Sequence, residues 1–421
     1  MPSYRAPRGA ADLLPEDQPY WRWLRDTATR VAESYGYGEV QTPVFEHVGV
    51  FLRPGSEGTD LADKEIYAFE DRGGDHLALR TDGTHGVARA YIEHGMSSWT
   101  QPVRLFYFVS VFRYDRPQAG RYRVHHQFGV EAIGDDSPVV DAEVIDLLRT
   151  YYDALGLRDY TLALNSIGDS VCRPGYLDKL RAYYADKLDK ICGDCVRRYD
   201  INPLRMLDCK NEPCQPFKPG APKSIDTLCG PCGEHFATVR RLLEALEIEY
   251  AIDTALVRGI DYYTRTAFEF QPKEEGSQST LGGGGRYDGL IEQLGGQPTP
   301  GTGFGAGIER LIINLKRQGL QPPDAGRRTD AYIAVTTPEA QARAMLLARD
   351  LRATKLDVIT GASDRSLRSQ MRQADALHAR YALVLGAQEL ANNTVSLRNL
   401  TTSDQQTVPI TDVANQLRQT K

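Results

Sequence analysis

Two neighbouring stretches of the chain have the pattern of β-strands joined by a polar loop. Residues 105–112 are almost all apolar or aromatic, and residues 124–133 alternate between polar and apolar side chains, as in a half-buried strand. The loop between them, DRPQAGR, is rich in turn residues and arginine. We therefore predict a β-hairpin that places Gln127 and Glu131 on one face of its second strand. The basic loop suits contact with phosphates, although an ordinary hairpin with a solvated tip fits the pattern equally well.

The same periodicities predict two domains and an inserted module. The linker QPPDAGRR, residues 321–328, separates a first domain, residues 1–325, from a second, residues 329–421. Within the first domain, residues 170–250 change to helical patterns with cysteine pairs and a proline-rich centre, which indicates an insertion. The predicted helices are at 16–36, 141–155, 308–315, 338–353 and 364–376. In the first domain we also predict a hairpin of 64–71 with 75–81 and strands at 39–45, 160–166 and 267–270. The predicted strands of the second domain are DAYIAV, LDVITG, YALVLG, NTVSLRNL and QTVPI.

Composition and charge add only broad limits. The 421 residues are 41% hydrophobic and 25% charged, which is typical of a globular protein of two or three domains. The net charge is −6, but residues 327–421 carry +4 and the remainder −10, so a basic tail domain is compatible with a nucleic-acid partner. The N-terminus lacks the apolar core of a secretory signal and no run of 18 apolar residues occurs, so we expect a cytoplasmic protein with no membrane partner.

Seven cysteines are present, and six of them fall between residues 192 and 232. An odd count in a cytoplasmic chain argues against a disulfide framework. Two CxxC pairs, Cys192 with Cys195 and Cys229 with Cys232, have the spacing of a structural zinc site, since a tetrahedral zinc ion takes thiolates from two tight turns. Cys209 and Cys214 compete for the metal, and buried free thiols are an equally good interpretation. We expect no catalytic zinc, because the only nearby histidine is His235.

Polar and aromatic residues crowd into a few short stretches that suit a binding cleft. The segment LVRGIDYYTRTAFEF has Arg258, Tyr262 and Tyr263 close together, a density that favours a cleft wall over a protein core, although a surface strand is the alternative. The four glycines 282–285, followed by Tyr287, let a ligand or another backbone approach closely. They lack the order of a dinucleotide-binding loop.

The stretch LRTDGTHGVARAYI passes from a strand into a helix. Its acid and hydroxyl, Asp82 and Thr84, are suited to hold an ammonium group. Capping of the helix is the commoner role for such residues.

Several of these motifs resemble one family. Arg113 with the hairpin loop and HHQFGVEAIG resembles motif 2 of class II aminoacyl-tRNA synthetases, and its wording is similar to that of bacterial histidyl-tRNA synthetases. The segment YGYGEVQTPVFEHVGVF resembles motif 1, with Pro43 at a dimer interface, and GTGFGAGIERLIINL resembles motif 3. LVRGIDYYTRTAFEF and STLGGGGRYDGL resemble the two histidine-specific motifs, and the second domain resembles the anticodon-binding domain. The resemblance covers essentially the whole chain.

This resemblance implies an α+β fold, with a class II antiparallel β-sheet catalytic core flanked by helices, a helical insertion and a C-terminal α/β anticodon-binding domain. It implies a homodimeric ATP-dependent ligase that converts L-histidine and ATP, with Mg²⁺, into histidyl-adenylate and then acylates the terminal adenosine of tRNA(His). Because the family usually has LRPEGT where this chain has LRTDGT, the shorter Asp82 replaces a glutamate.

Roles for individual residues follow from the same resemblance. Arg113 and Arg258 are expected to be the catalytic groups, at the α-phosphate and the histidine carboxylate. Arg121 and Arg310 are expected at the outer phosphates of ATP, and Arg116 and Gln118 at the acceptor end of the tRNA. The expected histidine-binding residues are Asp82, Thr84, Arg113, Gln127, Glu131, Arg258, Tyr262, Tyr263 and Tyr287, with Glu131 and Tyr263 on the imidazole ring.

Two alternatives remain open at this point. A non-catalytic paralogue, the regulatory subunit of ATP phosphoribosyltransferase, shares the fold, but the presence of Arg258, of both histidine motifs and of the second domain argues against it. A class II synthetase for another amino acid is excluded only by the histidine motifs.

Overall fold

The computed structural model describes residues 4–52, 65–115, 120–258, 262–273, 280–323 and 329–418. The chain forms two compact units, residues 1–322 and 323–421, each with its own hydrophobic core.

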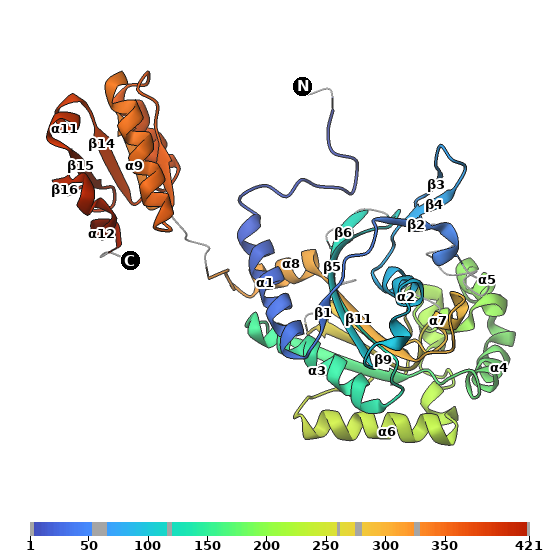
Figure 1. Cartoon of the computed structure of the whole chain (residues 1–421). Coiled ribbons are helices and arrows are strands. Elements are labelled where there is room, and N and C mark those ends of the chain that lie inside the picture. Colours follow the sequence, from blue (N-terminus) through green and yellow to red (C-terminus); the bar gives the residue numbers. More distant parts are fainter. Residues whose placement is uncertain are drawn as a thin grey trace. The chain divides into compact units, whose positions relative to one another are not determined.

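An eight-stranded, mostly antiparallel sheet forms the centre of the first unit (Figure 1). Neighbouring strands pair antiparallel except at the two ends of the sheet, where β1 pairs parallel with β5 and β7 with β8. This arrangement confirms the predicted antiparallel core. In spatial order the strands are β1 (Gly38–Glu39), β5 (Val103–Phe112), β6 (Val124–Ile133), β11 (Gly301–Gly307), β10 (Gly282–Arg286), β9 (Thr264–Pro272), β7 (Tyr160–Ser166) and β8 (Ala251–Ile252).

One face of this sheet is the main hydrophobic core. Alternate residues of the strands, among them Phe128, Val130 and Phe304, are buried against helices on that side. The helices that supply the rest of this core are α1 (Gln18–Ser34), α3 (Pro138–Ala154), α6 (Gly230–Ala245) and α8 (Ile308–Arg317). Helix α3 begins three residues before the predicted start, because Ser137 caps it and Pro138 occupies its first turn.

The hairpin of β5 and β6 has the predicted form. The two strands pair antiparallel in continuous register from Val103 with Ile133 to Phe112 with Val124. Since Phe128 and Val130 face the core, the flanking residues Gln127 and Glu131 lie together on the other face, as predicted. On that face helices α2 (Thr84–Glu93) and α7 (Leu290–Gln293) pack in a second hydrophobic cluster.

A buried ion pair ties the sheet to the helices on the core face. Arg286, at the end of β10, is fully buried and its guanidinium NH2 lies 2.7 Å from Asp141 of α3. His235 of α6 and Thr266 of β9 also bond to Asp141, at 2.7 and 2.6 Å. Every charge in this group is therefore matched, which is the condition for burying charge at acceptable cost.

Short strands of the first unit correspond to two other sequence predictions. The predicted strand around Pro43 is divided into β1 and β2 (Phe45–His47), which belong to different sheets. The predicted hairpin consists of β3 (Ala68–Glu70) and β4 (His76–Leu79), which pair antiparallel beside β2 in a three-stranded sheet.

The insertion contains α-helices and short 3₁₀ turns, and its described residues between α4 and α6 include no strand. It consists of α4 (Arg173–Tyr184), η4 (Ala185–Lys187), α5 (Gly193–Ile201), η5 (Pro203–Met206), η6 (Glu212–Phe217) and η7 (Ser224–Thr227), and leads into α6. The segment therefore gains none of the hydrogen-bond ladders that hold the central sheet.

The second unit is an α/β domain, as predicted. Its five-stranded sheet has the order β13-β12-β14-β15-β16, with the first three strands parallel and the last two antiparallel. The strands are β12 (Ala331–Val335), β13 (Val358–Thr360), β14 (Tyr381–Leu385), β15 (Thr394–Asn399) and β16 (Gln405–Pro409), and the helices are α9 (Gln341–Ala353), α10 (Leu367–Ala376), α11 (Ala387–Asn392) and α12 (Val413–Arg418).

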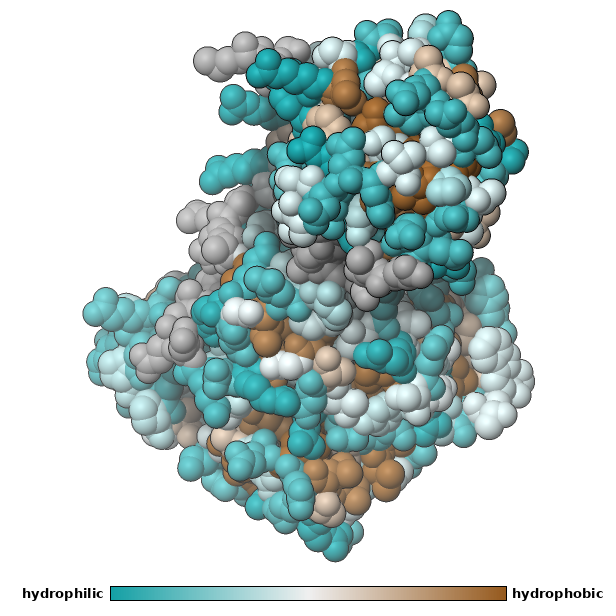
Figure 2. All heavy atoms as spheres, turned by 90° about the vertical axis from the view of Figure 1, so that its left-hand side faces the viewer, coloured by the Kyte–Doolittle hydropathy of each residue, from teal (hydrophilic) through white to brown (hydrophobic). Residues whose placement is uncertain are grey.

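Hydrophilic residues cover most of the surface visible in Figure 2, and apolar residues emerge between them in smaller patches. In the described part of the chain, no helix combines the length and the apolar character needed to cross a bilayer.

Candidate functional site

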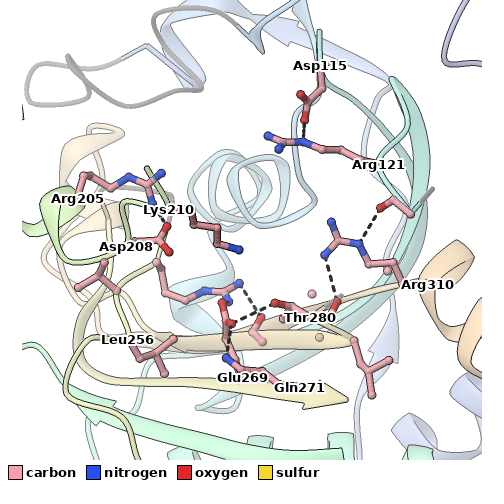
Figure 3. Close-up of a pocket in the computed structure, with 18 of the residues that line it drawn as sticks. Asp115, Arg121, Arg205, Asp208, Lys210, Leu256, Glu269, Gln271, Thr280 and Arg310 are labelled. Atoms are coloured by element: carbon pink, nitrogen blue, oxygen red, sulfur yellow. Dashed lines mark hydrogen bonds and ion pairs between the residues drawn. The ribbon is translucent and has the colours of Figure 1, made fainter. Parts of the chain in front are cut away.

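A large cavity lies on the face of the central sheet opposite the core (Figure 3). Its volume is about 840 Å³. The sheet, the start of α8 and the segment 205–211 of the insertion form its walls. Five residues singled out from the sequence line it together, namely Arg113, Arg121, Gln127, Arg258 and Arg310.

Glycines of β10 and β11, among them Gly283 and Gly305, form part of the cavity floor. In the strand register Gly305 lies between Gly129 of β6 and Gly283 of β10, and Gly303 lies between Glu131 and Gly285. A Cβ on Gly283 would come within 2.6 Å of the Arg258 guanidinium, and one on Gly303 within 2.2 Å of the Glu131 carboxylate. The glycines therefore leave the peptide groups bare, so that the charged side chains and a flat ligand can lie directly against the sheet.

Arg258 occupies a central position in this site. Its guanidinium forms an ion pair with Glu269 of β9 and donates a hydrogen bond of 3.3 Å to the Gly283 carbonyl. It also lies 5.6 Å from the ring centre of Tyr263. Burial is the largest single influence on Arg258 and opposes its charged form, but the charge of Glu269 together with Tyr263 and Tyr262 outweighs burial and raises the pKa of the guanidinium.

Three further guanidinium groups line the opposite part of the cavity. Arg113 donates to the Thr81 carbonyl at 3.0 Å, and Arg310 donates to the carbonyls of Gly120 and Thr280 at 2.8 and 3.1 Å. Arg121 pairs with the carboxylate of Asp115, as Figure 3 shows, and its other nitrogen is 3.6 Å from Glu65. Burial and then the positive charges of Arg113 and Arg121 lower the pKa of Arg310. This part of the cavity is therefore suited to a polyanion.

A second, enclosed group surrounds Glu131 at the other end of the same sheet face. Its carboxylate accepts hydrogen bonds from the hydroxyls of Thr84, Tyr107 and Tyr287, at 2.7, 3.0 and 2.6 Å. Glu131 is 1% exposed. Burial raises its pKa to about 8, although the three hydroxyl donors act in the opposite direction. Glu131 can thus gain or lose a proton near neutral pH.

Aromatic rings enclose the Glu131 group. The ring centres of Tyr262 and Tyr263 are 4.7 Å apart, and Tyr262 is 5.7 Å from Tyr287. His85 of α2 packs edge-on against Tyr262, with ring centres 5.2 Å apart. The predicted tyrosines of the two histidine-specific motifs therefore gather at one place.

Asp82, which was expected to hold an ammonium group, already has a partner in the structure. It is buried, and both of its carboxylate oxygens lie 2.9 Å from Nδ1 of His85. It also accepts a hydrogen bond from the His85 backbone N–H at the start of α2. Burial alone would raise the pKa of Asp82, but the charge and hydrogen bonds of His85 outweigh it and lower the pKa to about 2. Asp82 is therefore an ionised acid that also bonds to a backbone N–H in the first turn of α2.

Among the residues that the structure describes, buried polar atoms at the cavity without a hydrogen-bond partner include one amide oxygen and one imidazole nitrogen. They are Oε1 of Gln127 and Nδ1 of His125, and both side chains line the cavity. Burial and then the charge of Arg113 lower the pKa of His125 to about 3, so its imidazole is neutral. Buried polar atoms without partners are costly, and their position beside the cavity indicates that a ligand completes their hydrogen bonding.

Sequence reasoning missed several members of the site. Tyr107 lies inside a run that we interpreted only as apolar, yet strand alternation from Leu105 places it on the face of Glu131. Glu269 of β9, which forms the ion pair with Arg258, was not singled out either. Lys210 of the insertion points into the cavity (Figure 3), and no sequence pattern singled it out. The predicted tRNA contacts Arg116 and Gln118 lie outside the described residues.

The cysteines are grouped differently from the prediction. Cys192 and Cys195 lie with Cys209 and Cys214, whereas Cys229 and Cys232 lie with Asp169 and Cys172. The predicted zinc site made of both CxxC pairs is therefore wrong, because the fold places the two pairs in separate clusters. His235, the other nearby donor, is bonded to Asp141 in the core.

Comparisons with known proteins agree with this arrangement. The chain matches the family model described as histidyl-tRNA synthetase over residues 9–173 and 230–311, and the model of an anticodon-binding domain over residues 330–420. A histidine–tRNA ligase of Dehalococcoides mccartyi is 50% identical over 407 residues, which cover 97% of each chain. A histidine–tRNA ligase of Moorella thermoacetica is 45% identical over 415 residues, which cover 99% of this chain and 98% of the relative.

Solved structures show the same fold. The apo histidyl-tRNA synthetase of S. aureus superposes with a TM-score of 0.82 at 35% identity and covers 98% of this chain and 99% of its own. A Bacillus halodurans protein described as an ATP phosphoribosyltransferase regulatory subunit/histidyl-tRNA synthetase has a TM-score of 0.67 at 22% identity, covering 92% of this chain and 99% of its own. At that identity the likeness shows the fold alone.

Proposed function

Because the chain belongs to the histidyl-tRNA synthetase family, whose histidine–tRNA ligase activity it shares, we propose that the cavity and the Glu131 group together form its adenylation site. The cavity end would bind ATP, and the enclosed end would bind histidine. Arg258 supports this division most directly, since it lines the cavity and also lies against the Tyr263 ring.

Recognition of the imidazole ring falls to Glu131 and Tyr263 in this proposal. A carboxylate and a phenol on the two ring nitrogens would satisfy both, and another amino acid would leave these buried groups unmatched. Thr84 and Tyr287 already hold the Glu131 carboxylate in place. Tyr262 would close the pocket. Asp82 and the free Oε1 of Gln127 would bind the ammonium group, and Asp82 remains ionised for that purpose at neutral pH.

The triphosphate would lie among the arginines of the cavity. Arg113 would contact the α-phosphate, and Arg121 and Arg310 the outer phosphates, where their crowded positive charge favours an anion. The carboxylates of Glu269 and Asp208 line the same cavity and are hard oxygen donors of the kind that Mg²⁺ takes alongside phosphate oxygens. When bound, Mg²⁺ would neutralise part of the charge on the leaving pyrophosphate.

The reaction needs no nucleophilic side chain. A carboxylate oxygen of histidine forms a bond to the α-phosphorus while the bond from that phosphorus to the bridging oxygen breaks, which releases pyrophosphate. Arg258 would orient the histidine carboxylate, and Arg113 would stabilise the charge that builds up on the α-phosphate oxygens. The glycine floor would let both substrates lie against the sheet at the short separation that the attack requires.

The tRNA and a second copy of the chain complete the proposal. The anticodon-binding domain would hold the anticodon end of tRNA(His), and the loop that carries Arg116 and Gln118 would meet its acceptor end. A homodimer is supported by apolar side chains next to Pro43, because Val44 and Phe45 are 44% and 52% exposed.

The assignment of Arg258 can be tested with Arg258→Ala, and Arg158→Ala serves as the matched control. Loss of a positioned charge at the reacting groups is expected to lower histidine-dependent ATP–pyrophosphate exchange at least about 10²–10³-fold while the protein remains folded. Arg158 forms a surface ion pair with Asp153 and is expected to tolerate the change. Normal exchange in a folded Arg258→Ala protein would refute the assignment.

A further inference from the structure

Four cysteines of the insertion converge on one point. The sulfur atoms of Cys192, Cys195, Cys209 and Cys214 all lie within 4.8 Å of one another. Those of Cys192 and Cys209 are 3.7 Å apart. A tetrahedral zinc ion with Zn–S bonds of about 2.3 Å separates its sulfur ligands by about 3.8 Å. A disulfide would need about 2.05 Å, and all seven cysteines of the chain are free.

The local backbone is arranged as in a metal-binding knuckle. Cys192 caps the start of α5 and Cys195 lies in its first turn, with the Cys195 N–H bonded to the Cys192 carbonyl at 2.9 Å. The Cys192 N–H points at the sulfur of Cys214, 3.4 Å away. Such N–H···S contacts stabilise negative charge on sulfur, which a metal-bound thiolate retains. Three of the four cysteines are buried, so solvent has little access to the cluster.

We propose that Cys192, Cys195, Cys209 and Cys214 bind a structural zinc ion. Four thiolates at tetrahedral spacing form a closed site with no position left for a substrate, which is the pattern of structural zinc. The described insertion has only helices and 3₁₀ turns at this point, so a metal would supply the cross-link that a strand ladder supplies elsewhere. Nothing in this proposal depends on the roles assigned to the adenylation site.

The position of the cluster gives the metal a consequence for the cavity. Cys209 lies between Asp208 and Lys210, and these three residues line the cavity wall opposite the sheet. Figure 3 shows Lys210 directed into the cavity from that wall. A zinc ion would therefore fix the segment that closes the cavity on the side of the insertion.

The second cluster offers a matched comparison. It contains Cys172, Cys229, Cys232 and Asp169, and so replaces one thiolate by a carboxylate. The Asp169 carboxylate is already engaged, since it accepts from the backbone N–H groups of residues 171 and 172 and lies 3.6 Å from Arg265. Three thiolates and a partly occupied carboxylate make a poorer zinc site, and substitutions there leave the four-cysteine cluster intact.

Zinc content of the full-length protein, purified without chelator from zinc-supplemented medium, tests the proposal. Cys209→Ser and Cys192→Ser are each expected to lower the zinc content by one equivalent per chain relative to the wild type, and Cys229→Ser is expected to retain that equivalent. X-ray absorption on zinc in Cys229→Ser, which keeps only the four-cysteine cluster complete, is expected to show four sulfur ligands at about 2.3 Å.

Three results would overturn the proposal. One is wild-type protein with no zinc, and another is Cys209→Ser with the zinc content of the wild type. The third is a Cys229→Ser protein whose zinc has mainly nitrogen or oxygen ligands, or a Cys229→Ser protein that contains no zinc. This last measurement also decides the matter if Cys209→Ser fails to fold, because it leaves all four proposed ligands in place.

Discussion

The two faces of the central sheet have opposite characters although they share the same strands. On the core face, alternate residues such as Phe128, Phe304 and Phe268 are buried against helices. On the other face, the strands beside the cavity carry glycines and polar groups, among them Glu131 and Glu269, whereas β5 carries apolar residues that pack against α2. The strand period of two thus separates packing from chemistry within each strand.

This difference teaches how a folded sheet carries a costly site. Where it lines the cavity, the face opposite the core gains little from hydrophobic burial, and among the described residues polar atoms such as Oε1 of Gln127 have no hydrogen-bond partner. The core face supplies the stability that holds those groups in place, and on that face even the charges of Arg286 and Asp141 are matched. Substitutions on the two faces should therefore affect different measurements.

The largest effect on stability is expected for Arg286→Met on the core face. Removal of this guanidinium leaves Asp141 buried without its main partner, which should lower the free energy of unfolding by about 3–5 kcal/mol. Denaturant unfolding measures the loss. Arg104→Met, which breaks the half-exposed pair with Glu143, is the control and should cost about 1 kcal/mol or less. An equal loss of unfolding free energy in the two variants would show that the buried ion pair stabilises the fold no more than the partly exposed one.

Glu131→Gln should change how stability depends on pH. The pKa of Glu131 is raised from 4.5 to about 8 in the folded protein. The protonated side chain therefore contributes to the free energy of unfolding, and this contribution is fully present below about pH 4.5 and is lost as the pH rises toward 8. Because of this residue, the free energy of unfolding of the wild type should fall by about 2 kcal/mol between pH 5 and pH 7. One proton corresponds to about 1.4 kcal/mol for each pH unit. The variant lacks this slope.

Unfolding free energies of wild type and Glu131→Gln, measured without ligands at pH 5 and pH 7, check the expectation. The difference between them should move in favour of the variant as the pH rises. Parallel values at the two pH values would show that Glu131 does not titrate in this range.

The smallest effect on stability is expected for Gly305→Ala on the cavity floor. The nearest atom to the new Cβ would be the Gln127 amide nitrogen at 3.4 Å, so the fold should tolerate it. A methyl group on the floor should nevertheless raise the KM for ATP or histidine about tenfold, or about 1.4 kcal/mol. Gly175→Ala in α4, where no atom lies within 4 Å, is the control. A KM unchanged for both substrates would mean that neither lies on this floor.

The sequence predicted the parts of the fold that follow local periodicity. The hairpin, the shared face of Gln127 and Glu131, and the α/β second domain all follow from alternating patterns, and the structure confirms them. Family motifs indicated four arginines and one glutamine that line the cavity together.

Long-range partners were not predictable in this way. Spacing along the chain joined the two CxxC pairs, but the path of the insertion brings Cys209 and Cys214 to the first pair instead. The partnership of Arg286 with Asp141 spans 145 positions and carries no local signal.

The bare glycine floor also limits how this site can change. Pockets built from side chains can alter their shape by exchanging one rotamer or residue for another, but here the surface is the peptide backbone itself. Any larger residue at Gly283 or Gly303 would displace the enzyme's own Arg258 or Glu131. A flat inhibitor that stacked on this floor would therefore leave few substitutions that confer resistance without also reducing aminoacylation.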